Sequence, residues 1–212
     1  DFLLSLEQKM LVETVRDFIA SELQPLEEEI EISGKLDPDL AVEIKKKSLK
    51  LGLFAMNVPE SFGGAGLSTL DWILAEEQFG HTTDILIRRA FGNVYDILFE
   101  GTPEQVKRWL LPSVKGERVF SVAFTEPEAG SDAASIQTRA QKKKGRWVID
   151  GKKHFISDGA YSVFFVITAV TDPEQGHRGI STFIIDKNTK GVTVGRDQPM
   201  MGLRGTSHIE LF

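Results

Sequence analysis

The sequence predicts an α+β protein in which an all-helical N-terminal half is followed by a half built from β-strands. Up to about residue 116, apolar residues recur at the spacing of an α-helix, and capping signals precede them. From Glu117 onward the apolar period changes to two, which is typical of strands. A chain of 212 residues is long enough for two small domains. We therefore expect an α-helical domain over residues 1–116 and a β domain over residues 117–212.

Five helices are expected in the first half, and four of them are opened by a polar residue that can cap the first turn. They begin at Ser5, Asp37, Ser68, Asp84 and Thr102. The first and the last open capping boxes, with a glutamine three residues after the cap. The first should end near Pro25 and the last near Pro112, because proline disfavours helical backbone in the residue before it. The fourth should reach about Glu100 and contains Gly92, where we expect close packing or the approach of a ligand.

Eight strands are expected in the second half. They cover residues 117–124, 136–141, 147–149, 153–156, 163–170, 180–185, 192–194 and 207–212. Lys144-Gly145 and Asp150-Gly151 separate strand-like runs, and Asp-Gly in that position is a strong hairpin signal. Several short strands at close spacing predict a small antiparallel barrel or sandwich.

Composition and charge exclude several classes of function. No apolar run approaches the length of about 18 residues that a membrane span needs, so we expect none. The net charge is −6 and lysines and arginines are scattered, which argues against a nucleic-acid surface. There is no cysteine, and the four histidines show no metal-ligand spacing, so disulfides, thiolate chemistry and metal hydrolysis are not expected. The first residues show no targeting segment.

A glycine-rich stretch over residues 57–66 could cradle a phosphate if a strand preceded it and a helix followed it. The lysine of a P-loop is missing from it. We favour a structural loop, because flexible backbone at a turn is the commonest use of glycine.

The best candidate for a functional site is the turn-rich run from Ala123 to Ser135, where the helix-like sequence has given way to strands. Its polar residues could act as general acids and bases or could position a polar ligand: Thr125, Glu126, Glu128, Ser131 and Asp132. Carboxylates beside Pro127 and after Gly130 commonly bond to nearby backbone N–H groups and fix a turn, so we favour that role for them. Successive free amides and hydroxyls can form a concavity for an anion.

Two segments of the chain resemble the paired flavin-binding signatures of acyl-CoA dehydrogenases. The first is Thr125-Glu126-Pro127-Glu128-Ala129-Gly130-Ser131-Asp132, and the second is Gly151-Lys152-Lys153-His154-Phe155-Ile156-Ser157-Asp158-Gly159. Further matching segments follow the same order along the chain, at residues 59–64, 101–105 and 202–206. The succession of helices and then strands also matches, so the resemblance covers the whole chain.

The resemblance implies an FAD cofactor whose isoalloxazine ring lies along the first strand of the β domain. The cofactor-binding residues that it implies are Val122, Ala123, Phe124, Thr125, Gly130, Ser131, Phe155, Ile156 and Ser157. The Thr125 hydroxyl and nearby amides would bond to N5 and the pyrimidine edge of the ring, and Ser131 would reach a phosphate or the CoA arm of the substrate. The second signature usually reads Trp-Ile-Thr in the family, so Phe155 keeps an aromatic ring but not the indole N–H, which bears on redox tuning.

The implied reaction is α,β-dehydrogenation of an acyl-CoA to the trans-2-enoyl-CoA, with hydride transfer to flavin N5. The family places its glutamate base in a C-terminal four-helix bundle, which would lie beyond Phe212. The resemblance also implies an electron-transfer flavoprotein as electron acceptor and a homo-oligomer, either tetramer or dimer. It implies a location in the cytoplasm if the protein is bacterial, or in the mitochondrial matrix if it is eukaryotic.

Two alternatives remain open at this point. One keeps the fold and flavin but changes the reaction to that of an acyl-CoA oxidase or a flavin monooxygenase, and the other is a non-catalytic interaction module. Arg88 and Arg89 would line the acyl end of the substrate cavity and could bind a polar or carboxylated tail. We favour arginines that extend to the surface near Asp84 or Asp96.

Overall fold

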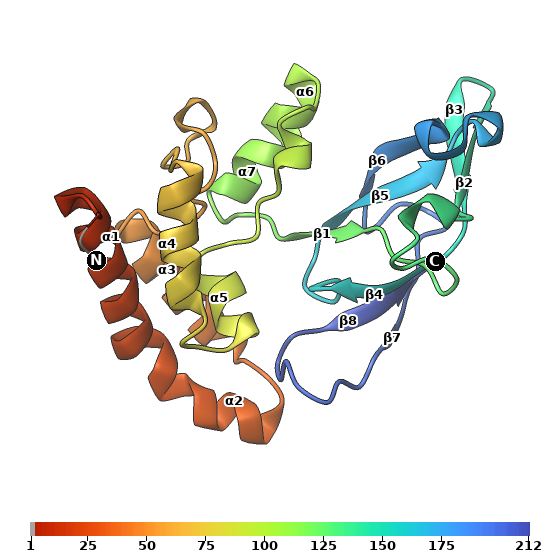
Figure 1. The fold of residues 1–212 in the computed structure, drawn as a ribbon. Helices are drawn as coiled ribbons and strands as arrows, with labels where there is room; N and C mark the ends of the chain where they lie inside the picture. The colour runs from red at the N-terminus through yellow and green to blue at the C-terminus, as the bar shows by residue number, and fades with distance from the viewer. Residues whose placement is uncertain (1–2) are drawn as a thin grey trace. The chain divides into compact units, whose positions relative to one another are not determined.

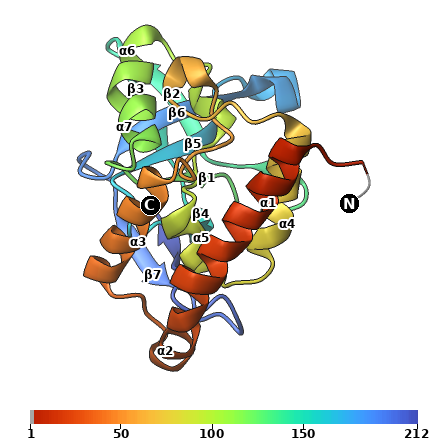
Figure 2. The same ribbon diagram turned by 90° about the vertical axis from the view of Figure 1, so that its left-hand side faces the viewer.

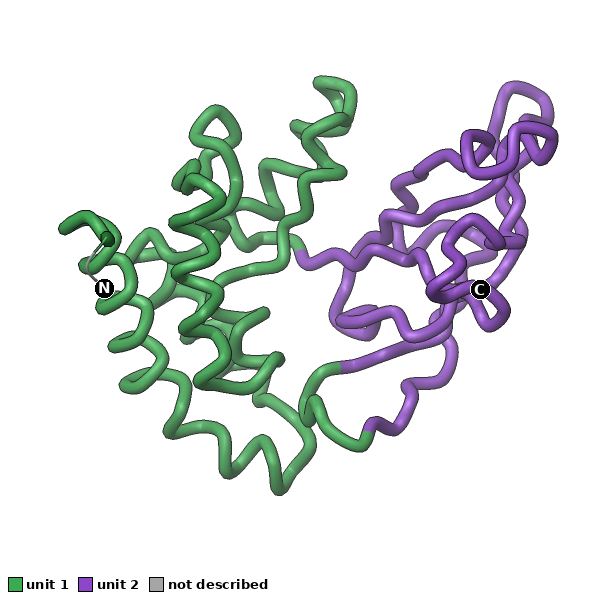
Figure 3. The backbone as a smooth tube through the Cα atoms, in the orientation of Figure 1, with its two compact units in different colours: residues 1–118, 201–206 green, residues 119–200, 207–212 purple. Residues whose placement is uncertain are grey.

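The computed structural model describes residues 3–212, and the chain forms two compact units (Figures 1 and 3). The first unit contains the residues up to Arg118 together with Met201–Thr206, and the second contains Val119–Met200 and Ser207–Phe212. The first is helical and the second is built from strands, so the predicted order of a helical half and a β half is confirmed. Among the described residues, no helix is long and apolar enough to span a membrane.

Within residues 3–118, where 3-10 and π-helical turns join some neighbouring helices, the first unit contains seven α-helical segments. They are α1 (Leu6–Phe18), α2 (Glu27–Ser33), α3 (Pro38–Lys50), α4 (Thr69–Phe79), α5 (Asp84–Ala90), α6 (Pro103–Gln105) and α7 (Leu111–Val114). Both predicted capping boxes form, from Ser5 with Gln8 and from Thr102 with Gln105. Local sequence signals therefore place these two helix starts correctly.

Three predicted helix ends are wrong, each because of backbone geometry. The chain stays helical beyond Pro25, because a π-helical segment (Ile19–Leu23) and a 3-10 turn (Gln24–Leu26) connect α1 to α2. It also stays helical beyond Pro112, which lies in the first turn of α7. Proline is tolerated in the first turn of a helical segment, where its missing N–H needs no partner. Helix α5 ends at Ala90 rather than near Glu100.

Gly92 explains the early end of α5. Its φ angle is +80°, and a Cβ there would lie 2.8 Å from the ring of Phe54. A left-handed conformation stops the helix, and the ring leaves no room for a side chain. The close-packing explanation for this glycine is therefore supported.

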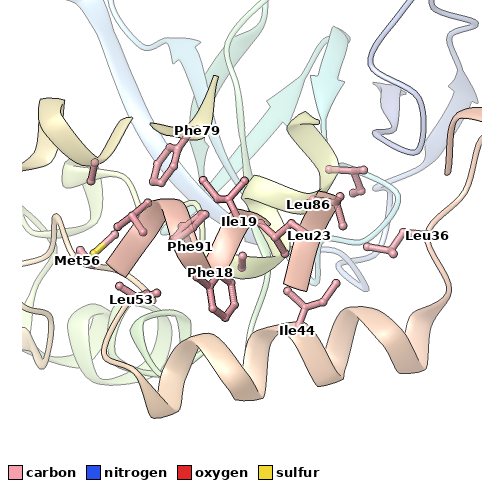
Figure 4. Close-up of a cluster of buried hydrophobic side chains, with 14 of the residues drawn as sticks. Phe18, Ile19, Leu23, Leu36, Ile44, Leu53, Met56, Phe79, Leu86 and Phe91 are labelled. Atoms are coloured by element: carbon pink, nitrogen blue, oxygen red, sulfur yellow. The ribbon is translucent and has the colours of Figure 1, made fainter. Parts of the chain in front are cut away.

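The core of the first unit gathers aromatic and aliphatic side chains from α1, α3, α4 and α5 (Figure 4). The Phe91 ring stacks on Phe79 at 4.3 Å between centroids and meets the edge of Phe18 at 5.9 Å. Helix α1 packs against α4 and α3 against α5, which can be followed in Figure 2. The segment Met201–Thr206 joins this unit through Thr206, whose Oγ1 donates to Asp84 Oδ2 at 3.0 Å.

The glycine-rich stretch after α3 is a closed structural loop. The Gly66 amide donates to the Val58 carbonyl at 2.9 Å, and Gly64 passes so close to Val58 that a Cβ would overlap its backbone. These contacts support the structural interpretation of the loop.

The second unit contains eight strands in two sheets. They are β1 (Phe120–Ala123), β2 (Arg139–Lys143), β3 (Arg146–Asp150), β4 (Lys153–Ser157), β5 (Phe164–Val170), β6 (Ile180–Asp186), β7 (Val194–Asp197) and β8 (His208–Leu211). One sheet has the order β1-β5-β2-β3, with β6 also paired to β5, and the other has the order β4-β8-β7. A shared apolar cluster, which includes Ala123, Phe165, Ile156 and Ile209, brings together residues of both sheets.

The pairing is mixed rather than wholly antiparallel. Strands β1 and β5 run parallel, with Phe120 opposite Phe164, whereas β5 and β6 are antiparallel. Alternation of apolar residues marks a strand but does not reveal its direction relative to a distant partner.

One of the two predicted hairpin turns is correct. Lys144 and Gly145 both have positive φ and join β2 to β3. Asp150-Gly151 is not a hairpin, because β3 and β4 belong to different sheets. Gly151 is needed there for close approach, since a Cβ would lie 2.4 Å from Thr138 Oγ1.

Candidate functional site

The two signature-like segments lie against each other within the second unit, although about two dozen residues separate them in sequence. The His154 amide donates to the Thr125 carbonyl at 2.8 Å, and Ser121 Oγ donates to the Ser157 carbonyl at 2.6 Å. Residues 122–125, which follow or lie in β1, and residues 155–157, in β4, are therefore brought together. This juxtaposition defines the candidate site.

A tight turn ends the first segment. The amides and carbonyls of Glu126 and Ala129 exchange hydrogen bonds at 2.9 and 3.2 Å, so Pro127 and Glu128 form the exposed tip. The buried Glu126 carboxylate accepts hydrogen bonds from the amides of Gln137 at 2.6 Å and Thr138 at 3.1 Å. Glu126 thus fixes the turn to the start of β2, as its sequence context suggests.

Lys153 completes the buried network around this carboxylate. Its Nζ lies 2.7 Å from Glu126 Oε1 and also donates to the Phe124 carbonyl at 3.1 Å and to Thr168 Oγ1 at 3.2 Å. All three ammonium protons therefore have acceptors. The pair links the end of β1 to β4 and β5.

The protonation of this pair reflects burial and hydrogen bonding. Burial is the largest effect on the pKa of Glu126 and raises it, but the hydrogen bonds from Lys153 and from the amides of Gln137 and Thr138 together bring that pKa below its ordinary value. Burial lowers the pKa of Lys153, and the Glu126 charge opposes that change. A carboxylate held ionised by several donors is suited to fixing structure rather than to exchanging protons.

The end of the first segment is open to solvent. Gly130 and Ser131 are exposed, and a Cβ on Gly130 would meet nothing within 4 Å. The carboxylate of Asp132 accepts a hydrogen bond from Ser135 Oγ, so it also holds local structure. The turn therefore leaves the hydroxyl of Ser131 at the surface.

A β-bulge shapes the second segment. The register between β4 and β8 shifts between Lys153 and Ile156, and Phe155 has a φ angle of +56°. This conformation costs about 1–3 kcal/mol for a residue other than glycine, and such strain is concentrated at ligand sites. The Phe155 side chain is 50% exposed, and its ring stacks on that of His154 with 4.0 Å between centroids. A strained backbone that presents an apolar ring to solvent fits a planar, partly apolar ligand such as a flavin.

Several important residues of the site are not apparent from sequence reasoning. Lys153 lies in the second signature-like segment, but nothing in the sequence marks it as the partner of Glu126. His208 lies opposite Ser157 in the β4–β8 ladder, with its Nδ1 at 3.1 Å from Ser157 Oγ. Inward-facing polar residues in apolar strands are the one signal that could have indicated both.

Arg88 has a partner within its own helix. Its Nε lies 2.6 Å from Asp84 Oδ2, one turn earlier on α5. Arg88 thus lies near Asp84 as expected, but its side chain is only 18% exposed, so the expectation that it extends to the surface is wrong.

A hollow of about 250 Å³ adjoins the Glu126 turn and is lined in part by Pro127, Gln137, Asp150 and Lys152. Ligand pockets commonly enclose about 300–1,000 Å³. This hollow is too small to enclose FAD, and we assign no cofactor to it. Within residues 3–212, no cluster of histidine and carboxylate side chains is arranged to hold a metal ion.

Comparison with known families identifies the class of protein. The profile of the acyl-CoA dehydrogenase N-terminal domain matches residues 5–117, and that of the acyl-CoA dehydrogenase middle domain matches residues 121–212. The chain therefore belongs to the acyl-CoA dehydrogenase family.

Individual relatives agree with this assignment. An acyl-CoA dehydrogenase of Bacillus subtilis is 37% identical over 209 residues, which are 97% of this chain and 54% of the relative. An acryloyl-CoA reductase (NADH) of Anaerotignum propionicum is 35% identical over 217 residues, covering 100% of this chain and 54% of the relative. The chain thus spans about half the length of these curated relatives.

Solved structures show the same fold. Butyryl-CoA dehydrogenase from Megasphaera elsdenii superposes with a TM-score of 0.84 at 30% identity, covering 100% of this chain and 56% of that one. An acyl-CoA dehydrogenase from Bacillus anthracis, solved in complex with FAD, gives a TM-score of 0.82 at 31% identity, covering 99% of this chain and 36% of that one.

Proposed function

We propose that this chain carries the FAD-binding part of an enzyme that oxidises an acyl-CoA thioester to the trans-2-enoyl-CoA. The observation that carries the proposal is the contact between the two signature-like segments, in which the exposed Phe155 directly follows His154, whose amide donates to the Thr125 carbonyl. The fold shared with the FAD complex from Bacillus anthracis supports the cofactor. When bound, FAD supplies the hydride-accepting chemistry, so the protein has to bind it, orient it and exclude water.

The burial of the candidate residues divides their roles. The side chains of Ala123 and Ile156 are 0% and 2% exposed and belong to the apolar core, so these two residues would contact the flavin through backbone atoms. Val122 and Phe124 are half-buried and alternate with Ala123 along the strand, so their side chains face the other way. We propose that they lie beneath the ring.

Polar contacts to the flavin would come from both segments. Thr125 and Ser157 are half-buried, and each carries a hydroxyl that can donate or accept a hydrogen bond. Phe155 would cover part of the ring. Gly130 would contribute its backbone amide, and the exposed Ser131 would bind a phosphate or the CoA arm of the substrate.

The remaining parts of the reaction are proposed from the family resemblance. A glutamate outside residues 1–212 would remove the proton α to the thioester carbonyl. An electron-transfer flavoprotein would take the electrons, and the protein would work as a homo-oligomer. The direction of the reaction is part of the proposal, because a relative of similar identity carries the name of a reductase. Recognition of a polar acyl tail by Arg88 or Arg89 stays the less favoured hypothesis.

The test is an anaerobic titration of the purified natural polypeptide that contains this sequence. Addition of a straight-chain acyl-CoA should bleach the visible absorption of the bound flavin and yield one equivalent of enoyl-CoA, detected by mass spectrometry. A reductase would instead consume enoyl-CoA at the expense of a reduced electron donor. An oxidase would be reoxidised rapidly by air. A flavin that no acyl-CoA of any chain length bleaches would refute the proposed dehydrogenation.

A further inference from the structure

Ser157 and His208 form a hydrogen-bonded pair across the second sheet. Ser157 is the last residue of β4, His208 is the first of β8, and the two stand opposite each other in the antiparallel ladder. Ser157 Oγ lies 3.1 Å from His208 Nδ1. The imidazole is 6% exposed, whereas Ser157 is half-buried. The pair therefore joins a buried ring to a hydroxyl at the candidate site.

The backbone on both sides of the pair is fixed. The amide of His208 donates to Asp197 Oδ1 at 2.7 Å, and its carbonyl accepts from the Gln198 amide at 2.9 Å. The carbonyl of Ser157 accepts from Ser121 Oγ at 2.6 Å, and Ser121 Oγ lies 2.7 Å from Ser162 Oγ. Because the backbone is held, the direction of the Ser157 hydroxyl hydrogen depends mainly on His208.

Only one of the two ring nitrogens of His208 has a hydrogen-bond partner among the described residues. Among residues 3–212, its Nε2 is buried without a hydrogen-bond partner. A neutral imidazole carries its proton on one nitrogen and a lone pair on the other. Buried N–H groups without partners are rarer in proteins than acceptors without partners. The proton is therefore better placed on Nδ1, where it can be donated to Ser157 Oγ.

This tautomer determines what Ser157 can do. An oxygen that accepts the Nδ1 hydrogen keeps its own hydrogen free to donate elsewhere. We propose that His208 is a positioning residue that makes Ser157 a hydrogen-bond donor to an acceptor atom on the edge of the oxidised flavin ring. The ligand is taken from the proposed function, whereas the tautomer follows from the protein alone.

The tautomer is tested without the cofactor. Nitrogen-15 NMR distinguishes a protonated from an unprotonated ring nitrogen, and the His208 signals are assigned by their loss in His208→Asn. In the natural polypeptide at about pH 8, where an imidazole is ordinarily neutral, the Nδ1–H form should predominate. The Ser157→Ala variant should lose that preference. A predominant Nε2–H form in the unaltered protein would overturn the inference, whether or not the protein binds FAD.

The consequence for the flavin is tested with three variants. An asparagine can place an amide N–H near the position of Nδ1, whereas a leucine of similar size cannot donate. We expect His208→Leu and Ser157→Ala each to slow flavin reduction by substrate about tenfold, since one hydrogen bond is worth about that factor. Each should also shift the flavin absorption spectrum and reduction potential, and His208→Asn should restore most of the rate, spectrum and potential.

A purely structural role predicts a different outcome. The double variant His208→Leu/Ser157→Ala should be no slower than Ser157→Ala alone, because His208 acts only through the Ser157 hydroxyl. If the two effects multiply, or if His208→Asn behaves like His208→Leu, the positioning role is wrong. Protein that takes up no FAD in its unaltered form would instead contradict the proposed function and leave the NMR result to decide the tautomer.

Discussion

Two regions of the signature-like segments, the Glu126–Lys153 network and the β4 bulge, differ in how completely their polar groups are hydrogen-bonded within the protein. Around Glu126 in the first segment, the carboxylate accepts from two amides and from Lys153 of the second segment, and Lys153 uses all three of its protons. At and just after the β4 bulge in the second segment, Phe155 and Asp158 have positive φ angles, and on the paired strand β8 the Nε2 atom of His208 has no hydrogen-bond partner among residues 3–212. The network around Glu126 and Lys153 is therefore fully hydrogen-bonded, whereas the backbone at the β4 bulge is strained.

This difference distinguishes a region that supports the fold from a region that binds a ligand. A buried network that satisfies every member holds its surroundings in one arrangement. Backbone strain persists only where the surrounding structure imposes it, and it is concentrated at ligand sites. We infer that the Glu126–Lys153 pair positions the end of β1, while the β4 bulge meets the flavin.

The largest effect should come from breaking the buried pair. Lys153→Met leaves the Glu126 carboxylate buried without its counter-charge, which typically costs about 3–5 kcal/mol of unfolding free energy. Urea unfolding of the natural polypeptide measures the loss, and hydrogen exchange at the Gln137 and Thr138 amides locates it. Lys152→Met, at the exposed neighbouring position, is the control and should change stability by less than about 0.5 kcal/mol. Equal effects of the two variants would contradict the supporting role of the pair.

Acid should weaken the same network. The folded-state pKa of Glu126 is lowered, so its contribution to stability is complete above the ordinary glutamate pKa of about 4.3 and is lost as the pH falls through the folded-state value. Glu126→Gln should lower stability by about 2 kcal/mol near neutral pH, in the range of a charged hydrogen bond. The gap between this variant and the unaltered protein should narrow below about pH 4. Glu128→Gln, at the exposed tip of the turn, should show neither change.

A smaller effect should come from releasing the strain at Phe155. Glycine adopts positive φ without penalty, so Phe155→Gly should be about 1 kcal/mol more stable than Phe155→Ala. Thermal unfolding of the two variants measures this difference in stability. Both variants lack the aromatic ring, so its loss does not contribute to the difference. Both variants should bind FAD about tenfold more weakly. If alanine were as stable as glycine there, the positive φ angle would not be a source of strain.

The smallest effect should appear at Gly130. A Cβ at this position meets no atom within 4 Å, and the residue does not have positive φ. Gly130→Ala should therefore change stability by less than about 0.5 kcal/mol and leave FAD affinity nearly unchanged, as measured by thermal unfolding and by FAD titration. A large loss of affinity would show that the ligand approaches this Cα closely, and that Gly130 contributes more than an amide.

Sequence reasoning succeeded where the determining contacts are local. The capping boxes at Ser5 and Thr102 and the turn at Lys144-Gly145 involve residues within a few positions of one another. Propensity and spacing therefore suffice to predict them.

Sequence reasoning failed where the contacting residues are far apart in sequence. The parallel pairing of β1 with β5, the passage from β3 to a different sheet at Gly151, and the end of α5 at Gly92 against Phe54 all depend on distant segments. The same limit applies within the site. The sequence contains Glu126, Lys153, Ser157 and His208, but their pairing follows from strand register, which no local pattern specifies.

The most direct test of flavin binding at the β4 bulge is an FAD titration of the natural polypeptide, monitored by the change in flavin absorption. Phe155→Ala and Trp147→Ala are compared in the same titration. Trp147 is an exposed aromatic of the same unit outside both segments. A flavin held at the β4 bulge predicts stoichiometric FAD binding in the unaltered protein and in Trp147→Ala, and about tenfold weaker binding in Phe155→Ala. Protein that takes up no FAD, or equal affinities of the two variants, would contradict a flavin held at the β4 bulge.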